Sequence, residues 1–229
     1  MRSITRRQFL KLGTASVGAI ALSKIKSTAA YLSDFPSEAK LGRVFSLVEV
    51  KAKPNPDSAT VKTFYDDGVM VLLKEVIGEP YNYYWRKRIW YETPEGYIPA
   101  ISVQPVKNLA NTPLDTLPVY GQAPGMWAEV TVPYVDIYLD GDSPKSPRLQ
   151  ETTKPRFYYS QVLWIDGIET INGDLNYHVL EQHGSYGDRF WADARAFRPI
   201  TPEDVAPITP EITNKSITVD INHNTMSLY

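Results

Sequence analysis

The stretch Trp90-Tyr91-Glu92-Thr93-Pro94-Glu95-Gly96-Tyr97-Ile98-Pro99 places aromatic residues on both sides of a Thr-Pro-Glu-Gly segment. Proline presets the φ of one turn residue and glycine accepts a positive φ, so this central segment is typical of a chain reversal. The aromatic residues on either side favour extended structure. The stretch therefore predicts a β-hairpin.

Segments with strand character precede this hairpin between residues 41 and 107. Alternating apolar residues predict strands at 45–50 and 61–65, and the Asp-Asp-Gly sequence at 66–68 predicts a turn. Residues 69–76 are largely apolar and predict a third strand, central in its sheet. We expect residues 41–107 to form one small β module.

The order of these elements resembles a bacterial SH3-like domain. The residues that carry the resemblance are Val50, Ala52 and Pro54 near the start, and Trp90, Tyr91, Gly96, Tyr97 and Ile98 near the end. The chain departs from that family at residues 81–87, which make a longer and more aromatic approach to the last hairpin.

A second β module, also SH3-like, is predicted at residues 120–198. Alternation predicts five strands, which lie at residues 127–132, 134–139, 162–167, 177–181 and 190–194. A proline-rich spacer follows at residues 199–212, with Thr201 as a helix cap and Pro202 at the first helical position. Pro207 and Pro210 keep the end of this spacer extended.

Residues 215–229 alternate apolar and polar side chains on either side of an Asn-His-Asn-Thr turn, which predicts another hairpin. It resembles the first hairpin of an L,D-transpeptidase catalytic domain, at Ile217, Val219, Asp220, Ile221, Met226, Leu228 and Tyr229. Residues 213–229 are therefore interpreted as the truncated start of such a domain. The predicted fold is mainly β, with two small SH3-like barrel modules, a proline-rich spacer and the start of a third β domain.

The chain contains no cysteine. L,D-transpeptidases are acyl transferases that attack peptidoglycan with a cysteine near a histidine, so the resemblance implies that the catalytic domain is missing and that this chain alone is inactive. No catalytic residue is predicted within it. The alternative is a stand-alone, non-enzymatic SH3-like protein that binds peptidoglycan.

The N-terminus predicts export. Arg6 and Arg7 are followed by Phe9 and Leu10 in a twin-arginine motif, and small residues predict cleavage after Ala30. Residues 12–23 are too short to span a bilayer, so no stable transmembrane anchor is expected. The expected partners are the twin-arginine export machinery and peptidoglycan, and the expected location is the cell wall or extracytoplasmic space.

Charge excludes one class of partner. Residues 1–30 hold six of the 24 Lys and Arg residues and none of the 26 Asp and Glu residues, so the chain after cleavage carries a net charge of −8. Such a chain repels nucleic acid, which is therefore not a predicted partner.

An aromatic and basic cluster, made of Tyr83, Trp85, Arg86, Arg88 and Tyr91, is the candidate wall-binding site. Its rings are suited to stacking on sugars while its cations meet muramyl-peptide carboxylates. The alternative is that alternate aromatics fill the core of the module and the basic residues face solvent. A similar, thinner group lies at residues 154–159.

No metal or cofactor is predicted. The histidines at 178, 183 and 223 are dispersed over two modules, so their spacing does not indicate a metal site. Asp140, Asp142 and Asp188 lie beside glycines but lack the regular carboxylate spacing of calcium loops, which favours a role in turns.

We expect export to depend on the paired arginines. The double variant R6K/R7K should leave uncleaved precursor in the cytoplasm, because the twin-arginine route reads that pair. Immunoblotting of cell fractions measures this, with R2K as the matched control outside the pair. Unchanged export of R6K/R7K would contradict the prediction.

Overall fold

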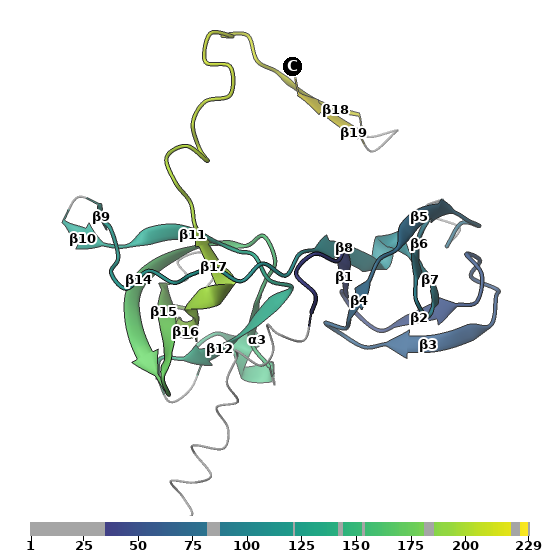
Figure 1. Cartoon of the computed structure of the whole chain (residues 1–229), viewed down its shortest axis with the longest axis horizontal. Helices are drawn as coiled ribbons and strands as arrows, with labels where there is room; N and C mark the ends of the chain where they lie inside the picture. The colour runs from purple at the N-terminus through teal and green to yellow at the C-terminus, as the bar shows by residue number, and fades with distance from the viewer. Residues whose placement is uncertain are drawn as a thin grey trace, which may run out of the picture. The chain divides into compact units, whose positions relative to one another are not determined.

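The computed structural model describes residues 35–81, 88–120, 122–141, 144–152, 154–180, 186–220 and 225–228. The chain divides into two compact units, unit 1 up to Pro199 and unit 2 from Ile200 (Figure 1). Antiparallel strands dominate, which confirms a mainly β fold. The signal-peptide residues lie outside the described range, so export stays a prediction. In the described part of the chain, no helix is long and apolar enough to cross a membrane.

The first half of unit 1 contains two antiparallel sheets, with strand orders β3-β2-β7-β6-β5 and β4-β1-β8. The strands are β1 (Leu41–Val44), β2 (Val48–Lys51), β3 (Thr60–Phe64), β4 (Val69–Val71), β5 (Lys74–Ile77), β6 (Ile89–Thr93), β7 (Gly96–Pro99) and β8 (Val103–Val106), with the 3-10 turn η1 (Ala100–Ser102) before β8. Every residue of β1 is buried. Side chains from both sheets form one core that includes Val44, Val48, Met70 and Ile98.

The predicted hairpin around Pro94 is confirmed as β6 and β7. The Thr93 hydroxyl accepts a hydrogen bond from the backbone N–H of Gly96 at 3.2 Å and donates to its carbonyl at 3.0 Å. Gly96 has a φ of 151°, and a Cβ there would lie 2.6 Å from the carbonyl oxygen of Lys51, so the position requires glycine. Trp90 is fully buried, and its indole N–H donates to the carbonyl of Glu79 at 2.8 Å.

Two strand predictions in this half are wrong in their extent. The strand expected at 45–50 begins only at Val48, because the chain bends after β1 and leaves Phe45 and Leu47 more than half exposed. The single central strand expected at 69–76 is two edge strands, β4 and β5, in different sheets. The break falls at Leu72 and Leu73, where the chain passes from one sheet to the other.

The second half of unit 1 is built on a seven-stranded antiparallel sheet of order β13-β12-β16-β15-β14-β11-β17. Its strands are β11 (Met126–Val130), β12 (Tyr134–Leu139), β13 (Arg156–Tyr158), β14 (Val162–Ile171), β15 (Asp174–Leu180), β16 (Arg189–Asp193) and β17 (Phe197–Pro199). The hairpin of β9 (Val119–Tyr120) and β10 (Ala123–Pro124) precedes them, helix α3 (Pro147–Glu151) follows β12, and η2 (Ala194–Ala196) follows β16. Each of the five strands predicted here has its counterpart.

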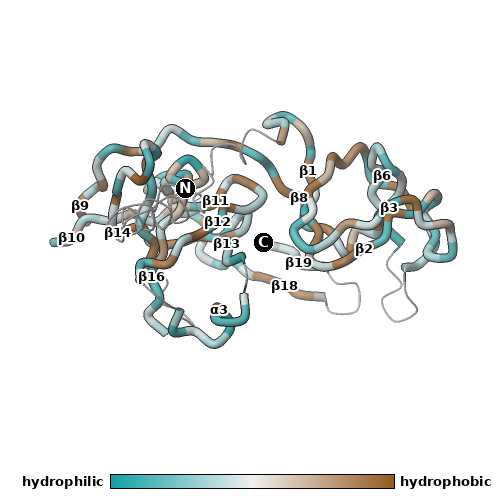
Figure 2. Tube along the Cα trace, turned by 90° about the horizontal axis from the view of Figure 1, so that it is seen from below, coloured by the Kyte–Doolittle hydropathy of each residue, from teal (hydrophilic) through white to brown (hydrophobic). Residues whose placement is uncertain are grey.

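The core of the second half follows from period-2 patterning. Along β11, Met126, Ala128 and Val130 are buried while the residues between them are not, and hydrophobic and hydrophilic residues are interspersed in this half (Figure 2). The inward side chains gather around Phe157, whose ring packs edge-on against Phe190 at 5.7 Å and against Phe197 at 6.5 Å between centroids. Such aromatic pairs contribute about 0.5–1.5 kcal/mol each beyond the burial of their area.

A buried ionic network joins the two halves of unit 1. Asp67 lies in the predicted turn before β4, where it adopts a φ of 63°. One of its carboxylate oxygens accepts from Arg43 at 2.6 Å and the other from Arg156 at 2.9 Å. The Arg43 guanidinium also lies over the ring of Tyr158, 4.1 Å from its centroid. The side chains of the two arginines and the aspartate are at most 14% exposed.

Arg156 is held in its charged form. Burial by itself lowers the pKa of Arg156, but hydrogen bonds to Asp136 and Asp67 outweigh it and raise the pKa above its ordinary value. The bond to Asp136 measures 2.7 Å, and the guanidinium lies 3.8 Å from the ring centroid of Tyr134. Arg156 therefore makes its contacts with carboxylates from both halves of unit 1.

Unit 2 begins with a turn in which Thr201 and Asp204 bond reciprocally. The Asp204 carboxylate accepts from the N–H of Thr201 at 2.8 Å, and the Thr201 hydroxyl accepts from the N–H of Asp204 at 3.4 Å. Further along, β18 (Ile217–Asp220) pairs with β19 (Thr225–Leu228), which confirms the predicted hairpin. Its residues Ile217 and Val219 are more than 60% exposed.

We expect Asp67 to be a centre of stability. D67N keeps a side chain that tolerates positive φ but removes the carboxylate that pairs with buried Arg43 and one of the two that pair with Arg156, which should cost about 3–5 kcal/mol in the free energy of unfolding. Urea denaturation measures this. The matched control is K62M, which breaks an exposed pair with Glu95 and should cost about 0–1 kcal/mol. Equal losses in the two variants would contradict the role of the network.

Candidate ligand-binding groove

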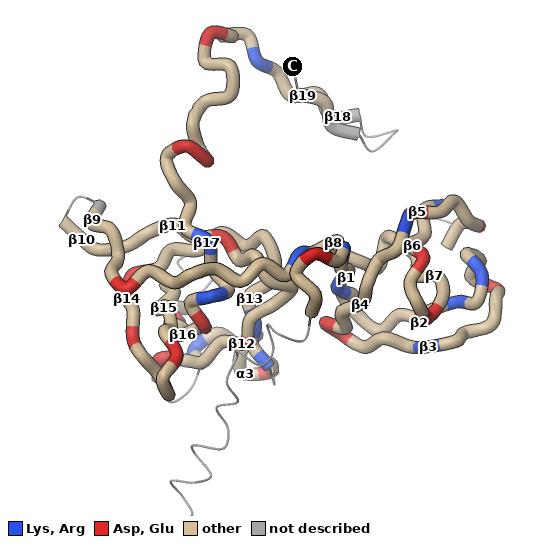
Figure 3. Tube along the Cα trace, viewed as in Figure 1, with Lys and Arg blue, Asp and Glu red and all other residues tan. Residues whose placement is uncertain are grey.

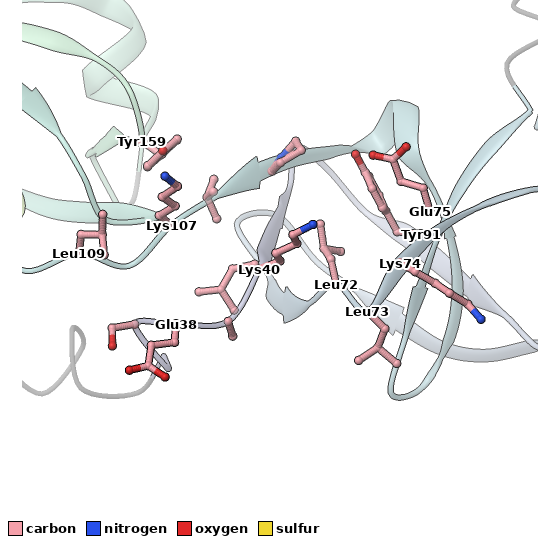
Figure 4. A pocket seen from close by; sticks show the side chains of 15 residues that line it. Glu38, Lys40, Leu72, Leu73, Lys74, Glu75, Tyr91, Lys107, Leu109 and Tyr159 are labelled. Atoms are coloured by element: carbon pink, nitrogen blue, oxygen red, sulfur yellow. The ribbon is translucent and has the colours of Figure 1, made fainter.

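Unit 1 contains a groove of about 540 Å³ between the segment that leads into β1 and the strands β5, β6 and β8 (Figure 4). Both halves of the unit contribute to it. Tyr91 comes from β6 in the first half, and Tyr159 directly follows β13 in the second half. The groove therefore depends on how the two halves of unit 1 pack.

Apolar side chains form the floor of the groove. Leu41, Leu72 and Val106 line it and are 1–6% exposed. Leu41 on β1 pairs in register with Val106 on β8, so the floor is part of the smaller sheet. At the rim, Leu73 is 54% exposed, because the break between β4 and β5 turns it away from the core.

Tyr91 forms one wall of the groove. Burial raises the pKa of its phenol, and the nearby carboxylate of Glu75, to which it is hydrogen-bonded, raises it further. Tyr91 is therefore a neutral hydroxyl at physiological pH, with an aromatic ring beside the apolar floor. Glu75 reaches it from β5, which pairs residue for residue with β6.

Tyr159 is positioned by the ionic network. The residue before it, Tyr158, lies under the Arg43 guanidinium, and its hydroxyl donates to Asp67 at 3.3 Å. The backbone of Tyr159 is fixed as well, since its N–H donates to the carbonyl of Pro133 and its carbonyl accepts from Gln104. The second half thereby delivers one aromatic ring to the groove.

Charged side chains of both signs line the groove. Lys40, Lys74 and Lys107 contribute cations, while Glu38 and Glu75 contribute carboxylates (Figure 4). This mixture continues over unit 1, where Lys and Arg residues are interspersed with Asp and Glu residues (Figure 3). An apolar floor with two phenols and charges at the rim suits an amphipathic ligand that carries carboxylates.

The structure does not bring the described members of the predicted wall-binding cluster together at one site. Tyr83, Trp85 and Arg86 lie outside the described residues. Arg88 donates from Nε to the carbonyl of Gly78 at 3.0 Å and does not line the groove, whereas Tyr91 does.

Trp90, the residue before Tyr91 on β6, is a core residue. The alternation of burial along β6 therefore places Trp90 inside and leaves Tyr91 partly exposed. The thinner aromatic group at 154–159 divides similarly, with Phe157 in the core and Tyr159 in the groove.

Sequence reasoning missed most of the groove. Lys40, Leu72, Leu73 and Lys107 carry no motif, and the two leucines were expected inside one continuous strand. The only signal was the aromatic content at Tyr91 and Tyr159. These two residues are far apart in the sequence, and nothing local indicates that they line one groove.

His178 is a packed imidazole. Its Nδ1 lies 2.5 Å from a carboxylate oxygen of Asp166, and its Nε2 lies 3.5 Å from Asp140. Its ring is 4.8 Å from that of Trp191. Among the residues that the structure describes, no group of three His, Cys, Asp or Glu side chains is arranged to hold a metal ion. His183 and His223 lie outside those residues.

Asp188 behaves as a loop residue. Its carboxylate accepts from the backbone N–H groups of Lys145 at 2.8 Å and Ser146 at 2.9 Å, next to the start of α3. Asp142, which is predicted to share a turn with Asp140, lies outside the described residues. The fold and groove together define a mainly β protein with a groove that has an apolar floor and charged side chains at its rim.

No protein-family model matches the chain, and no curated protein matches it. Among solved structures, the chain is similar to NlpC2 from Trichomonas vaginalis, with 15% identity over 76% of this chain and a TM-score of 0.22. The match covers 52% of that structure, so the chain spans about half its length.

We expect Glu75 to control the ionisation of Tyr91. E75Q removes the carboxylate, so the pKa of Tyr91 should move down toward its ordinary value of 10.0 while burial keeps it above that value. A ring-carbon NMR titration, with the Tyr91 signal assigned through Y91F, measures the shift. An unchanged pKa in E75Q would contradict the contact.

The raised pKa of Tyr91 makes the stability of the folded protein depend on pH. Because the pKa of Tyr91 is higher in the folded protein than in the unfolded chain, the neutral phenol stabilises the fold below pH about 10. That contribution is lost as the pH rises through the folded-state pKa. Y91F, which cannot ionise, should therefore lose less stability than the wild type over this alkaline range.

Proposed function

We propose that this chain is an exported cell-wall protein whose unit 1 binds peptidoglycan through the groove. In this proposal it is the targeting and wall-positioning region of a peptidoglycan L,D-transpeptidase. The single observation that carries the proposal is the groove itself, with Tyr91 and Tyr159 beside an apolar floor and lysines at its rim.

The chemistry of the groove matches a muramyl peptide. The apolar floor of Leu41, Leu72 and Val106 suits the methyl groups of short peptide side chains. Lys40 and Lys107 suit peptide carboxylates, and the phenols of Tyr91 and Tyr159 offer hydroxyls together with flat apolar faces.

The strand pairing of the first half supports the SH3-like assignment. The residues that resemble SH3-like domains, Trp90 to Ile98, form the hairpin β6–β7 at the centre of a five-stranded sheet whose other neighbours are β5 and β2. A second small sheet packs on the same core. This is the local arrangement that we propose to be SH3-like.

The proposal assigns acyl transfer to residues outside these 229. The chain has no cysteine and so lacks the nucleophile of the L,D-transpeptidase reaction. Hairpin β18–β19 contains the residues that resemble the first hairpin of an L,D-transpeptidase catalytic domain, which supports the proposal. The alternative of a stand-alone wall-binding protein shares the groove and differs only in lacking that domain.

Peptidoglycan pull-down tests the groove. Y91A should reduce retention on purified sacculi by about tenfold, because it removes an aromatic wall of the site. The matched control is Y97A, a partly buried tyrosine on the neighbouring strand that does not line the groove. Melting temperatures of both variants report on folding.

Equal retention of Y91A and the wild type on sacculi would contradict the proposal. If Y91A loses its fold, K107E provides the decisive measurement, because Lys107 is exposed and lines the groove without belonging to the core. Reversing its charge should weaken retention more at low salt than at high salt. Salt-independent, wild-type retention of K107E would count against carboxylate recognition.

A further inference from the structure

The outer face of β11 and β14 carries two tryptophans that the groove does not use. Trp127 and Trp164 lie directly opposite each other in register, with ring centroids 5.4 Å apart and planes at 68°. Trp127 is 50% exposed, and Val162, two residues before Trp164, is 49% exposed. We call Trp127, Trp164 and Val162 the tryptophan platform.

The platform is preformed by the fold beneath it. Trp127 must point outward because its neighbours Met126 and Ala128 are buried in the core at 2% and 0% exposure. Trp164 covers the backbone of Gly125, where a Cβ would lie 2.2 Å from the indole ring. A side chain at position 125 would therefore displace Trp164, so the glycine sets how closely the ring approaches the chain.

Fixed polar groups flank the platform on the same face. Glu129 lies two residues after Trp127 and pairs in register with Val162 on one side and Arg198 on the other. Its carboxylate accepts from Arg198 at 3.0 Å and from the hydroxyl of Ser160 at 3.1 Å. This ion pair is accessible from outside, since the Arg198 side chain is 41% exposed.

The charge and the size of the platform restrict the chemical class of ligand that fits it. The charges of Glu129 and Arg198 cancel, which favours a neutral ligand over an anionic one. Three side chains cannot supply the roughly 800 Å² per partner that a stable dimer buries, which disfavours a second copy of the chain. Sugar rings fit both criteria, because their C–H faces meet aromatic rings and their hydroxyls meet paired carboxylate and guanidinium groups.

We propose that the tryptophan platform binds the rings of a neutral, linear polysaccharide, with Trp127 as the stacking residue and Glu129 and Arg198 as hydroxyl partners. The site is separate from the groove in its residues, and the proposal does not depend on peptide binding by the groove. One ring stacks on Trp127 while the next hydrogen-bonds along β11 toward Glu129.

Titration with chitohexaose tests the platform on the full chain. Tryptophan fluorescence and calorimetry should show saturable binding to the wild type, and W127A should weaken it by about tenfold. W127Y keeps an aromatic face and should stay within about threefold of the wild type, as one ring replaces another. The groove variant Y91A should bind chitohexaose normally, which separates this site from the groove.

Three results would overturn the proposal. These are no binding of chitohexaose to the wild type, equal binding by W127A, or a concentration-dependent dimer that W127A abolishes. If W127A does not fold, the wild-type protein decides the matter, because the indole N–H signal of Trp127, assigned through W127Y, must shift on addition of chitohexaose. An unshifted signal would exclude Trp127 from the site.

Discussion

The carboxylate of Asp67 holds unit 1 together, because each of its oxygens binds a guanidinium group from a different half of the unit. Burying two arginines is costly unless both are paired. Arg43 and Arg156 meet this condition through Asp67, and each also lies over a tyrosine ring. Asp67 therefore pairs with two buried cations at once, and Asp136 supplies a second carboxylate to Arg156.

The network of Asp67, Arg43 and Arg156 positions one side of the groove. Arg43 fixes Tyr158, and the next residue along the chain, Tyr159, then lines the groove opposite the strands of the first half. Gln104 strengthens the link, since its side chain bonds both Arg43 and the carbonyl of Tyr159. The ionic network and the geometry of the groove are thus coupled in unit 1, so a change at Asp67 should alter the position of Tyr159.

The tryptophan platform lies on a regular strand, whereas the groove lies where a strand is interrupted. At the platform, alternation along β11 sends Trp127 outward from a filled core, so a flat sheet face carries the rings. At the groove, the interruption at Leu72 and Leu73 opens space between two sheets. A regular strand therefore produces the exposed surface, and an irregular one produces the concave site.

Local patterns in the chain predict the mainly β class, the hairpins around Pro94 and between β18 and β19, and the strands of the second half, because alternation and turn residues act locally. Packing between the sheets splits residues 69–76 into two edge strands and selects which face of β6 is fully buried, that of Trp90 rather than that of Tyr91. The same packing brings Tyr91 and Tyr159 to one groove and Asp67 to two arginines. Those outcomes depend on contacts between residues distant in sequence, which no local pattern encodes.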